Sequence, residues 1–365
     1  MIKLNIVGYL GFHNFGDDLM LIGLLGELNR KGRFRVNVFV KNKTGLEKNA
    51  MRWLNLDVRI ITLSKLTTVL LPYYVLFASR TIWCGGTCLY EDPSDPGLRG
   101  LKWIRRIAIY SGLFGRKLLL MNIGVNQLIS DRAKAIVGEI VARNNTFISV
   151  RDISSLENLQ SISPAPNPVV LGGDLAFLNH MESVRNNGES DYIVFCGHLQ
   201  YAENTEVVDF YVQALSKIST TLNKSIVMVS LHGGASGDDL FHDRIKGRME
   251  CPVTCIRYSS GEINTLADLF SGSYCVISMR LHGVVFAELL MKPSIGISYS
   301  DKVRYFVEKT NNISSCRIKG VKEKLTPEDV VLVTGGYKVS ASFIDAERAL
   351  SKDGVDVLLN LTSVL

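Results

Sequence analysis

The stretch Ile277-Ser278-Met279-Arg280-Leu281-His282-Gly283 places an arginine and a histidine between a predicted strand and a predicted helix. Residues Tyr274 to Met279 are largely β-branched or apolar, and the apolar run Val284 to Met291 favours a buried helix. Ligands of open α/β sheets bind at the carboxyl ends of the strands, where the first N–H groups of the next helix favour an anion. The pattern therefore predicts an anion site at Arg280 and His282. Alternatively, Arg280 pairs with a structural carboxylate and His282 only caps the helix.

A second copy of the pattern favours the functional interpretation. The segment Ile148-Ser149-Val150-Arg151 repeats Ile-Ser-x-Arg in the first half of the chain, after an apolar strand at Thr146 to Val150 and before a helical segment at Ser154 to Leu159. We therefore expect two similar halves that carry an arginine on equivalent turns, facing each other across a cleft.

The composition predicts two globular domains. The chain has 365 residues, of which 47% are hydrophobic and 21% charged. Its net charge of +6 fits an anionic substrate, an anionic membrane surface or nucleic acid, and selects none of them. Seven cysteines are an odd number, and two of them, Cys196 and Cys275, lie in strand-like runs. A reducing compartment is therefore more consistent with the sequence than a disulfide framework. No histidine cluster accompanies the closely spaced cysteines, so no metal site is expected.

The sequence also bears on location. Residues 2 to 9 read as a strand instead of a signal peptide, and we expect a cytoplasmic protein. The apolar stretch Leu66 to Ala78 is shorter than the about 20 residues that span a bilayer, and Pro72 interrupts it. We expect a core helix there, or an element that dips into a membrane interface.

The first predicted strand, Ile2 to Val7, leads through a glycine-bearing loop into a helical run at Leu19 to Leu28. Asp17 and Asp18 lie in the first turn of that helix, where carboxylates favour the helix dipole. The loop does not have the G-x-G-x-x-G spacing, and two carboxylates would repel a pyrophosphate, so we reject a dinucleotide site. Carboxylates at a loop tip suit sugar hydroxyls better. Alternatively, Asp17 is only an N-cap and Asp18 a solvated charge.

Strands and helices then alternate along the whole chain, which predicts an α/β fold with two doubly wound, Rossmann-like domains. The polar segment Glu182 to Ser190 has no apolar periodicity and marks the boundary. We expect a first domain at residues 1–180, a second at 181–338 and a helical tail at 339–365 that crosses back onto the first domain. The stretch from Tyr90 to Gly100 is expected to form a loop over the cleft.

A basic stripe on one predicted helix suggests a contact with lipid. Arg99, Lys102 and Arg106 share one side of this helix, and Trp103 and its apolar neighbours form the other. This arrangement fits a face on anionic lipid, or a solvated face of a helix packed on its sheet. Nucleic-acid binding is not expected, because the basic residues are not interleaved with aromatic ones.

With these segments in place, the chain resembles the polysaccharide pyruvyl transferase family over nearly its whole length. The resemblance rests on an ordered set of motifs: Gly8-Tyr-Leu-Gly11, Asn14-Phe-Gly16-Asp17-Asp18, Gly85-Gly86, Ser149-Val-Arg151-Asp152, Ser278-Met-Arg280-Leu-His282-Gly283, Gly296-Ile-Ser-Tyr299 and Lys302-Val-Arg304. It implies a GT-B-like fold and transfer of the enolpyruvyl group of phosphoenolpyruvate to a sugar as a ketal. It implies phosphoenolpyruvate as co-substrate, with no cofactor and no metal.

The sequence departs from the family pattern at three positions. Asp18 replaces the usual glutamate, Thr87 replaces a third glycine, and Leu175 stands where a proline often follows Asp174. The first departure bears on the acceptor contacts more than on the donor site, because Asp and Glu differ in reach.

The resemblance also assigns roles to residues. Planar guanidinium groups bind a carboxylate and a phosphate in bidentate fashion, which agrees with arginines as donor ligands. The expected donor-binding residues are Arg151, Arg280, Lys302, Leu281 and Gly283. His282 is the expected proton donor, and Asp17 or Asp18 accepts a hydroxyl proton or orients the sugar. The expected acceptor-binding residues are Gly11, Asn14, Gly16, Gly85 and Gly86.

The resemblance implies a glycan or lipid-linked oligosaccharide acceptor on the first domain and the donor on the second. The basic stripe suggests a membrane surface as a further partner, at the inner face of the cytoplasmic membrane. Two alternatives stay open. One is a glycosyltransferase of the same architecture that uses a nucleotide sugar. The other is a non-catalytic scaffold of glycan assembly.

Overall fold

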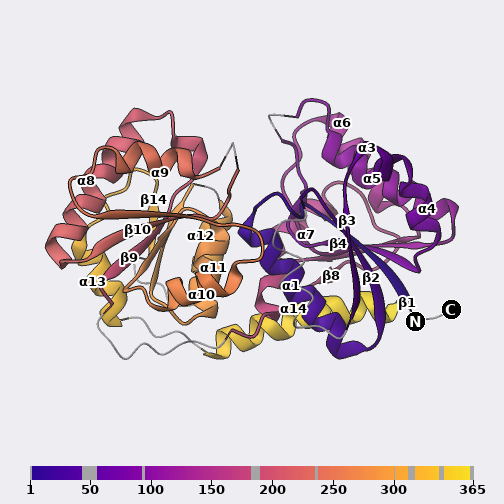
Figure 1. Cartoon of the computed structure of the whole chain (residues 1–365). Helices are drawn as coiled ribbons and strands as arrows, with labels where there is room; N and C mark the ends of the chain where they lie inside the picture. Colours follow the sequence, from indigo (N-terminus) through magenta and orange to yellow (C-terminus); the bar gives the residue numbers. More distant parts are fainter. Residues whose placement is uncertain are drawn as a thin grey trace. The chain divides into compact units, whose positions relative to one another are not determined.

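The computed structural model of the chain describes residues 2–42, 56–92, 95–181, 190–234, 237–299, 301–310, 317–336 and 341–361. These residues form an α/β fold with two parallel sheets, each in its own compact unit (Figure 1). The first unit comprises Met1–Phe12, Gly16–Asn179 and Asp345–Leu365, and the second comprises His13–Phe15 and His180–Ile344. The predicted α/β class with two parallel sheets is confirmed. Residues 182–189 of the predicted boundary, 93–94 of the predicted loop and 339–340 and 362–365 of the predicted tail lie outside the described residues.

The first sheet has the strand order β3-β2-β1-β4-β6-β7-β8, with β5 beside β6 and all pairs parallel. Its strands are β1 (Ile2–Val7), β2 (Phe34–Val40), β3 (Asp57–Thr62), β4 (Arg80–Cys84), β5 (Thr87–Leu89), β6 (Lys117–Val125), β7 (Thr146–Val150) and β8 (Val170–Leu171). Its helices are α1 (Phe15–Lys31), α3 (Lys65–Val69), α4 (Leu71–Leu76), α5 (Arg99–Leu113), α6 (Asp131–Val141) and α7 (Ile153–Gln160). The order reverses between β1 and β4.

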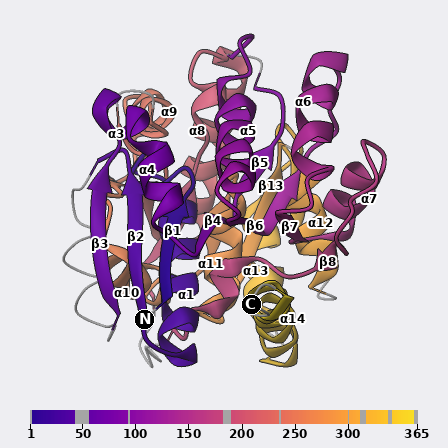
Figure 2. The same cartoon turned by 90° about the vertical axis from the view of Figure 1, so that its right-hand side faces the viewer.

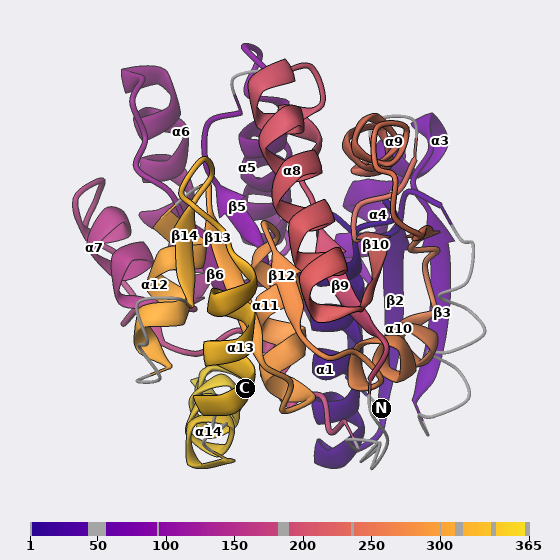
Figure 3. The same ribbon diagram turned by 90° about the vertical axis from the view of Figure 1, so that its left-hand side faces the viewer.

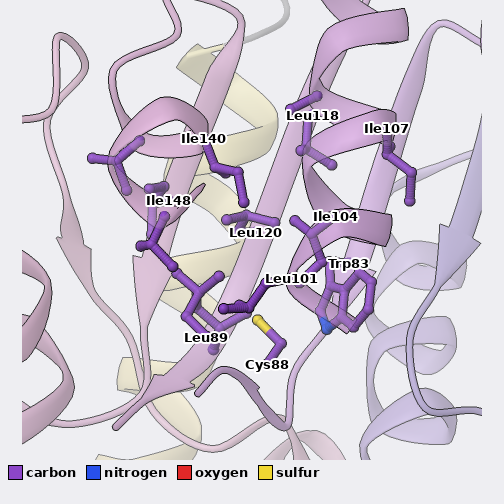
Figure 4. Close-up of a cluster of buried hydrophobic side chains, with 14 of the residues drawn as sticks. Trp83, Cys88, Leu89, Leu101, Ile104, Ile107, Leu118, Leu120, Ile140 and Ile148 are labelled. Atoms are coloured by element: carbon purple, nitrogen blue, oxygen red, sulfur yellow. The ribbon is translucent and has the colours of Figure 1, made fainter. Parts of the chain in front are cut away.

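The core of the first unit lies between this sheet and a helical layer that includes α4, α5 and α6. Helix α5 buries Leu101, Ile104 and Ile107, which recur at helical spacing and therefore share one face. They pack in one cluster with Leu118 and Leu120 of β6 (Figure 4). Buried from both sides, the central strands read as nearly continuous apolar runs, as expected of a parallel sheet.

The second sheet has the order β11-β10-β9-β12-β13-β14, again with parallel pairs. Its strands are β9 (Tyr192–Cys196), β10 (Ser225–Ser230), β11 (Val253–Arg257), β12 (Val276–Ser278), β13 (Ser294–Ser298) and β14 (Ile318–Gly320). Its helices are α8 (Thr205–Leu222), α9 (Asp239–Lys246), α10 (Ile263–Ser271), α11 (Leu281–Leu289), α12 (Asp301–Lys309) and α13 (Pro327–Gly336). Figure 3 shows α8 and α13 on one face of this sheet, where both contribute to the same core cluster.

The last helix, α14 (Ala341–Leu361), joins the first unit from Asp345 onward. Ser351 Oγ donates a hydrogen bond to the Asp174 carbonyl at 2.8 Å, and Asn122 Nδ2 donates to the Ser351 carbonyl at 3.1 Å. Gly173 allows this close packing, because a Cβ atom there would lie 2.5 Å from Ser351 Oγ. None of the described helices combines the length and the apolar character that crossing a membrane requires.

Candidate functional site

The second sheet brings several polar side chains to one edge. Its strand order reverses between β9 and β12, and ligands of open α/β sheets bind at the carboxyl ends of the strands at such a reversal. His198 follows β9 and Arg280 follows β12. On either side, His232 follows β10, and Lys302 is the second residue of the helix after β13. The predicted anion site at Arg280 therefore lies at the point of the sheet where the fold favours a ligand.

The turn that carries Arg280 is fixed locally. Ser278 Oγ donates to the Arg280 carbonyl at 2.8 Å and accepts from the Arg280 N–H at 3.0 Å. Arg280 is the N-cap of α11, so His282 is the second residue of the helix. Gly283 is required by the packing, because a Cβ atom there would lie 2.3 Å from Ser278 Oγ. Helix α11 can start this close to the strand only with glycine at that position.

Arg280 is held by the fully buried carboxylate of Asp238. The Nε and Nη2 atoms of Arg280 donate to the two Asp238 oxygens, with an Nε–Oδ2 distance of 3.0 Å. Asp238 also accepts from the backbone N–H groups of His232 at 3.0 Å and Leu199 at 3.2 Å. One carboxylate thus ties together the ends of β9, β10 and β12. The sequence left open that Arg280 pairs with a structural carboxylate, and this pairing is present, with Asp238 as the partner.

This pairing is compatible with anion binding. Asp238 occupies the side edge of the guanidinium, formed by Nε and Nη2. A guanidinium has five N–H donors and a second edge, formed by Nη1 and Nη2, that binds oxyanions in the same bidentate way. The Arg280 side chain retains 21% of its exposure, so Asp238 fixes the plane of the group without enclosing it.

Three histidines around this site are neutral near pH 7. Burial, and then the charge of Arg280, lowers the pKa of His198 to about 4, against the opposing effect of Asp238. The same two causes lower the pKa of His232. Burial also lowers the pKa of His242 to about 4. His242 Nε2 accepts from the Gly197 N–H at 2.9 Å, so its proton lies on Nδ1, 3.0 Å from Ser230 Oγ.

The segment His13–Phe15 belongs to the second unit, although the residues on both sides of it belong to the first. Phe15 N–H donates to the Leu231 carbonyl, and Asn14 forms an antiparallel bridge with His232. The Phe15 ring packs edge-on against Phe286, with centroids 4.7 Å apart. Asn14 therefore lies beside the Arg280 site, whereas Gly11 and Gly16, which the resemblance groups with it, belong to the first unit.

In the first unit, carboxylates gather at the strand reversal. Gly85 and Gly86 follow β4 with positive φ angles of 49° and 68°. A Cβ atom on Gly86 would lie 3.3 Å from Asp17 Oδ1, so Gly86 lies close to the Asp17 carboxylate. Asp18 is fully buried, which suits a structural role better than contact with a sugar. Burial raises the pKa of Cys84, and the charges of Asp17, Asp174 and Asp18 raise it further.

Gly11 has a structural role in this unit. Its φ angle is +74°, and a Cβ atom there would lie 2.6 Å from the Asn42 carbonyl oxygen. Only glycine allows the chain to pass this close to the end of β2.

A cluster of aromatic side chains lies close to Asp17. The Tyr9 ring contacts Phe12, Trp83 and Tyr90 edge-on, with centroids 6.3, 5.8 and 6.5 Å apart. Burial and the hydrogen-bonded Tyr90 hydroxyl raise the pKa of Tyr9, and the Asp17 charge adds to this effect. The first unit therefore presents phenol hydroxyls and a carboxylate together.

Arg151 lies in a different position in its sheet from Arg280. Arg151 follows β7, which is separated from the reversal by β4 and β6, whereas Arg280 follows a strand at the reversal itself. The expectation that the two arginines occupy equivalent turns was wrong, because similar local sequences lie on strands of different rank. Arg151 is nearly buried and contacts Asp152 at 3.1 Å, Asp174 at 3.8 Å and Thr87 at 3.3 Å. Its charge is balanced within the first unit.

The sequence analysis missed Asp238, although a signal was present. Gly237-Asp238-Asp239 repeats the Gly-Asp-Asp tripeptide of Gly16 to Asp18, and both copies lie at the start of a helix. Within the described part of the chain, no group of three or more His, Cys, Asp or Glu side chains is arranged to hold a metal ion.

A family model described as polysaccharide pyruvyl transferase matches residues 14–301. No curated protein matches the chain. Similar solved structures include UDP-GlcNAc 2-epimerase from Methanocaldococcus jannaschii, at a TM-score of 0.63 and 12% identity over 98% of this chain and 100% of that one. Anabaena Alr3699/HepE in complex with UDP-glucose has a TM-score of 0.60 and 11% identity, with 100% of both chains covered. At these identities the likeness establishes the fold alone, and the predicted GT-B-like fold is confirmed.

Proposed function

The chain belongs to the polysaccharide pyruvyl transferase family, which is a family of enzymes, and we propose that it transfers the enolpyruvyl group of phosphoenolpyruvate to two hydroxyls of one sugar. The acceptor in this proposal is a sugar of a cell-surface polysaccharide or of its lipid-linked precursor. The observation that carries the proposal is the Arg280 guanidinium, which Asp238 fixes along one edge at the strand reversal of the second sheet. Its other edge suits the carboxylate or the phosphate of the donor.

In this reaction one proton is added to a carbon of the donor, and one proton is removed from each of two sugar hydroxyls. A proton adds to the methylene carbon of phosphoenolpyruvate, which becomes a methyl group and leaves C2 electron-poor. One sugar hydroxyl attacks C2 and loses its proton. The second hydroxyl then attacks as the C2–O bond to phosphate breaks, and it also loses its proton. The products are a pyruvate ketal and inorganic phosphate, so the enzyme needs a proton donor and a proton acceptor.

In this proposal the donor binds in the second unit. Arg280 and Lys302 supply positive charge at the carboxyl ends of neighbouring strands, and the first N–H groups of α11 face the same anion. His282, in the first turn of that helix, delivers the proton to the methylene carbon. Neutral His198 and His232 donate hydrogen bonds without adding charge.

The acceptor binds in the first unit in this proposal. Asp17 and the phenols of Tyr9 and Tyr90 match the hydroxyls of a sugar, and aromatic rings pack on its apolar face. Asp17 takes up a hydroxyl proton or orients the sugar, whereas the fully buried Asp18 supports the loop. That Arg151 also binds the donor stays a prediction, because its contacts lie with Asp152, Asp174 and Thr87.

Ligand stabilisation and turnover test this proposal together. Phosphoenolpyruvate should raise the melting temperature, because a ligand that binds only the folded state stabilises it. UDP-glucose and UDP-GlcNAc serve as controls, and stabilisation by these alone would favour a glycosyltransferase. Incubation with lipid-linked glycans should release phosphate. His282→Gln should keep phosphoenolpyruvate binding and lose roughly 10²- to 10⁴-fold in rate. Turnover near the wild-type rate would remove His282 from the mechanism.

We further propose that the enzyme acts at the inner face of the cytoplasmic membrane. A lipid-linked acceptor is confined to a bilayer, and an enzyme that binds the same surface meets it at a higher effective concentration.

A further inference from the structure

Helices α3 and α4 carry a row of large apolar side chains that face solvent. Five side chains form this row, and each is between 38% and 75% exposed: Leu66, Val69, Leu70, Tyr73 and Phe77. Their spacing places them along one helical side. Helix α3 buries none of its residues. Soluble proteins rarely leave so many large apolar residues exposed side by side unless the patch binds something.

A basic stripe lies beside this row. Helix α4 packs against α5, as Figure 2 shows, and Arg116 Nε donates to the Leu76 carbonyl at 3.1 Å. Arg99, Lys102 and Arg106 lie on α5 opposite its buried side, so they point away from the core. The exposed Leu113 continues the stripe toward the end of α4.

Acidic residues are absent from the sequence of this region. No Asp or Glu occurs from Val58 to Tyr90 or from Pro96 to Ser130, in a chain that has 35 of them. Among the described residues, Asp95 pairs with Arg99 of this stripe and Glu139 pairs with the neighbouring Arg105. The apolar row thus has a basic surround on the side of α5.

We propose that this surface, named here the docking face, binds an anionic lipid bilayer. It consists of Leu66, Val69, Leu70, Tyr73, Phe77 and Leu113 with Arg99, Lys102 and Arg106. Apolar side chains enter the boundary between headgroups and acyl chains, and the cations attract anionic headgroups. Tyr73 suits the interface, because its ring is apolar and its hydroxyl stays hydrated. Charge complementarity favours a bilayer over a second copy of this chain, whose docking face has the same positive sign.

The inference does not rest on pyruvyl transfer. The segment Leu66 to Ala78, for which the sequence left a core helix and an interfacial element open, has both a buried and an exposed side. Leu71 and Val75 are buried in the core of the first unit, while the apolar row that begins at Leu66 and ends at Phe77 is exposed.

Sedimentation of the full chain with lipid vesicles tests the docking face. The wild type should bind vesicles of phosphatidylcholine and phosphatidylglycerol, bind pure phosphatidylcholine much less, and lose binding as salt screens the charges. Lys102→Gln with Arg106→Gln should weaken partitioning at low salt by about fivefold per charge. Leu66→Ser with Val69→Ser should weaken it by about tenfold or more at any salt concentration.

Matched variants in the second unit serve as controls. Lys217→Gln with Lys246→Gln removes two exposed charges, and Leu332→Ser removes an exposed apolar side chain. Both should sediment like the wild type. Light scattering without vesicles gives the oligomeric state, and phosphoenolpyruvate stabilisation gives an independent check of the donor site.

The proposal is overturned if the docking-face variants bind as tightly as the controls, or if neutral vesicles bind as well as anionic ones. It is also overturned if the wild type is a dimer that Leu66→Ser with Val69→Ser dissociates. That result would identify the occupant as a second copy of this chain. Loss of vesicle binding with unchanged phosphoenolpyruvate stabilisation would support the docking face whether or not pyruvyl transfer is observed.

Discussion

Replacing Arg280 by lysine and by alanine separates its two contacts. Alanine removes the cation and leaves the Asp238 carboxylate buried, with the N–H groups of His232 and Leu199 as its remaining hydrogen-bond donors among the described residues. Breaking a buried ion pair costs about 3–5 kcal/mol, and these remaining hydrogen bonds favour the lower figure. At about 2–4 °C per kcal/mol for a unit of this size, the melting temperature should fall by roughly 6–12 °C.

Arg280→Lys should behave differently. An ammonium group keeps the charge beside Asp238, so the loss of stability should be about 1 kcal/mol. A lysine cannot offer one edge to Asp238 and a parallel edge to the donor. A charged hydrogen bond contributes about 1.5–3 kcal/mol, so phosphoenolpyruvate should bind about 10- to 150-fold more weakly.

Two measurements check these figures. Urea unfolding followed by circular dichroism gives stability, and calorimetry gives phosphoenolpyruvate affinity. Asp238→Asn serves as the matched variant on the other side of the pair, and the double variant gives the coupling energy. If Arg280→Lys binds phosphoenolpyruvate as tightly as the wild type, the second edge of the guanidinium does not bind the donor. If Arg280→Ala unfolds at the wild-type urea concentration, Asp238 does not depend on its partner.

Two further predictions concern the same sheet edge. Gly283→Ala should lower the free energy of unfolding by about 1–3 kcal/mol and weaken phosphoenolpyruvate binding, because its Cβ atom would lie 2.3 Å from Ser278 Oγ. Urea unfolding measures the stability and calorimetry measures the binding. Unchanged values would contradict the close contact. The folded-state pKa of His242, about 4, lies below its ordinary value of 6.5, so between these values the unfolded state binds more protons. Stability should therefore fall as the pH drops from 6.5 to 4, by up to roughly 3 kcal/mol from this group. Urea unfolding across this range should show a shallower slope for His242→Gln, and equal slopes would count against the neutral buried imidazole.

Features encoded within one or two turns of chain were predictable from the sequence. The alternation of apolar runs indicated two parallel sheets, because strands buried on both faces need apolar residues at nearly every position. The turn at Arg280 was equally predictable, since a strand, the polar residues Arg280 and His282, and an apolar helix follow each other directly. The conformation of such a turn, and with it the direction of its carbonyl and N–H groups, depends on residues that are close together in the sequence.

The rank of each strand in its sheet was decided by tertiary structure. Ile-Ser-x-Arg is the same local pattern at both arginines, yet only Arg280 follows a strand at a reversal. Strand order depends on pairing between segments far apart in the chain, and a local pattern carries no information about it. The same reason explains why Asp238 was missed, because its partner Arg280 lies 42 residues away.

Tertiary structure also decided which apolar residues are buried. Leu66 to Ala78 is apolar on all sides, so its periodicity could not separate core from surface, and the packing of α4 on α5 leaves one side exposed. The assignment of His13–Phe15 to the second unit has a similar cause. The local sequence favours a loop before α1, but burial of the Phe15 ring against Phe286 and Tyr258 is a long-range contact. Hydrophobic burial is not directional, so the sequence specifies that such a ring is buried and the fold specifies where.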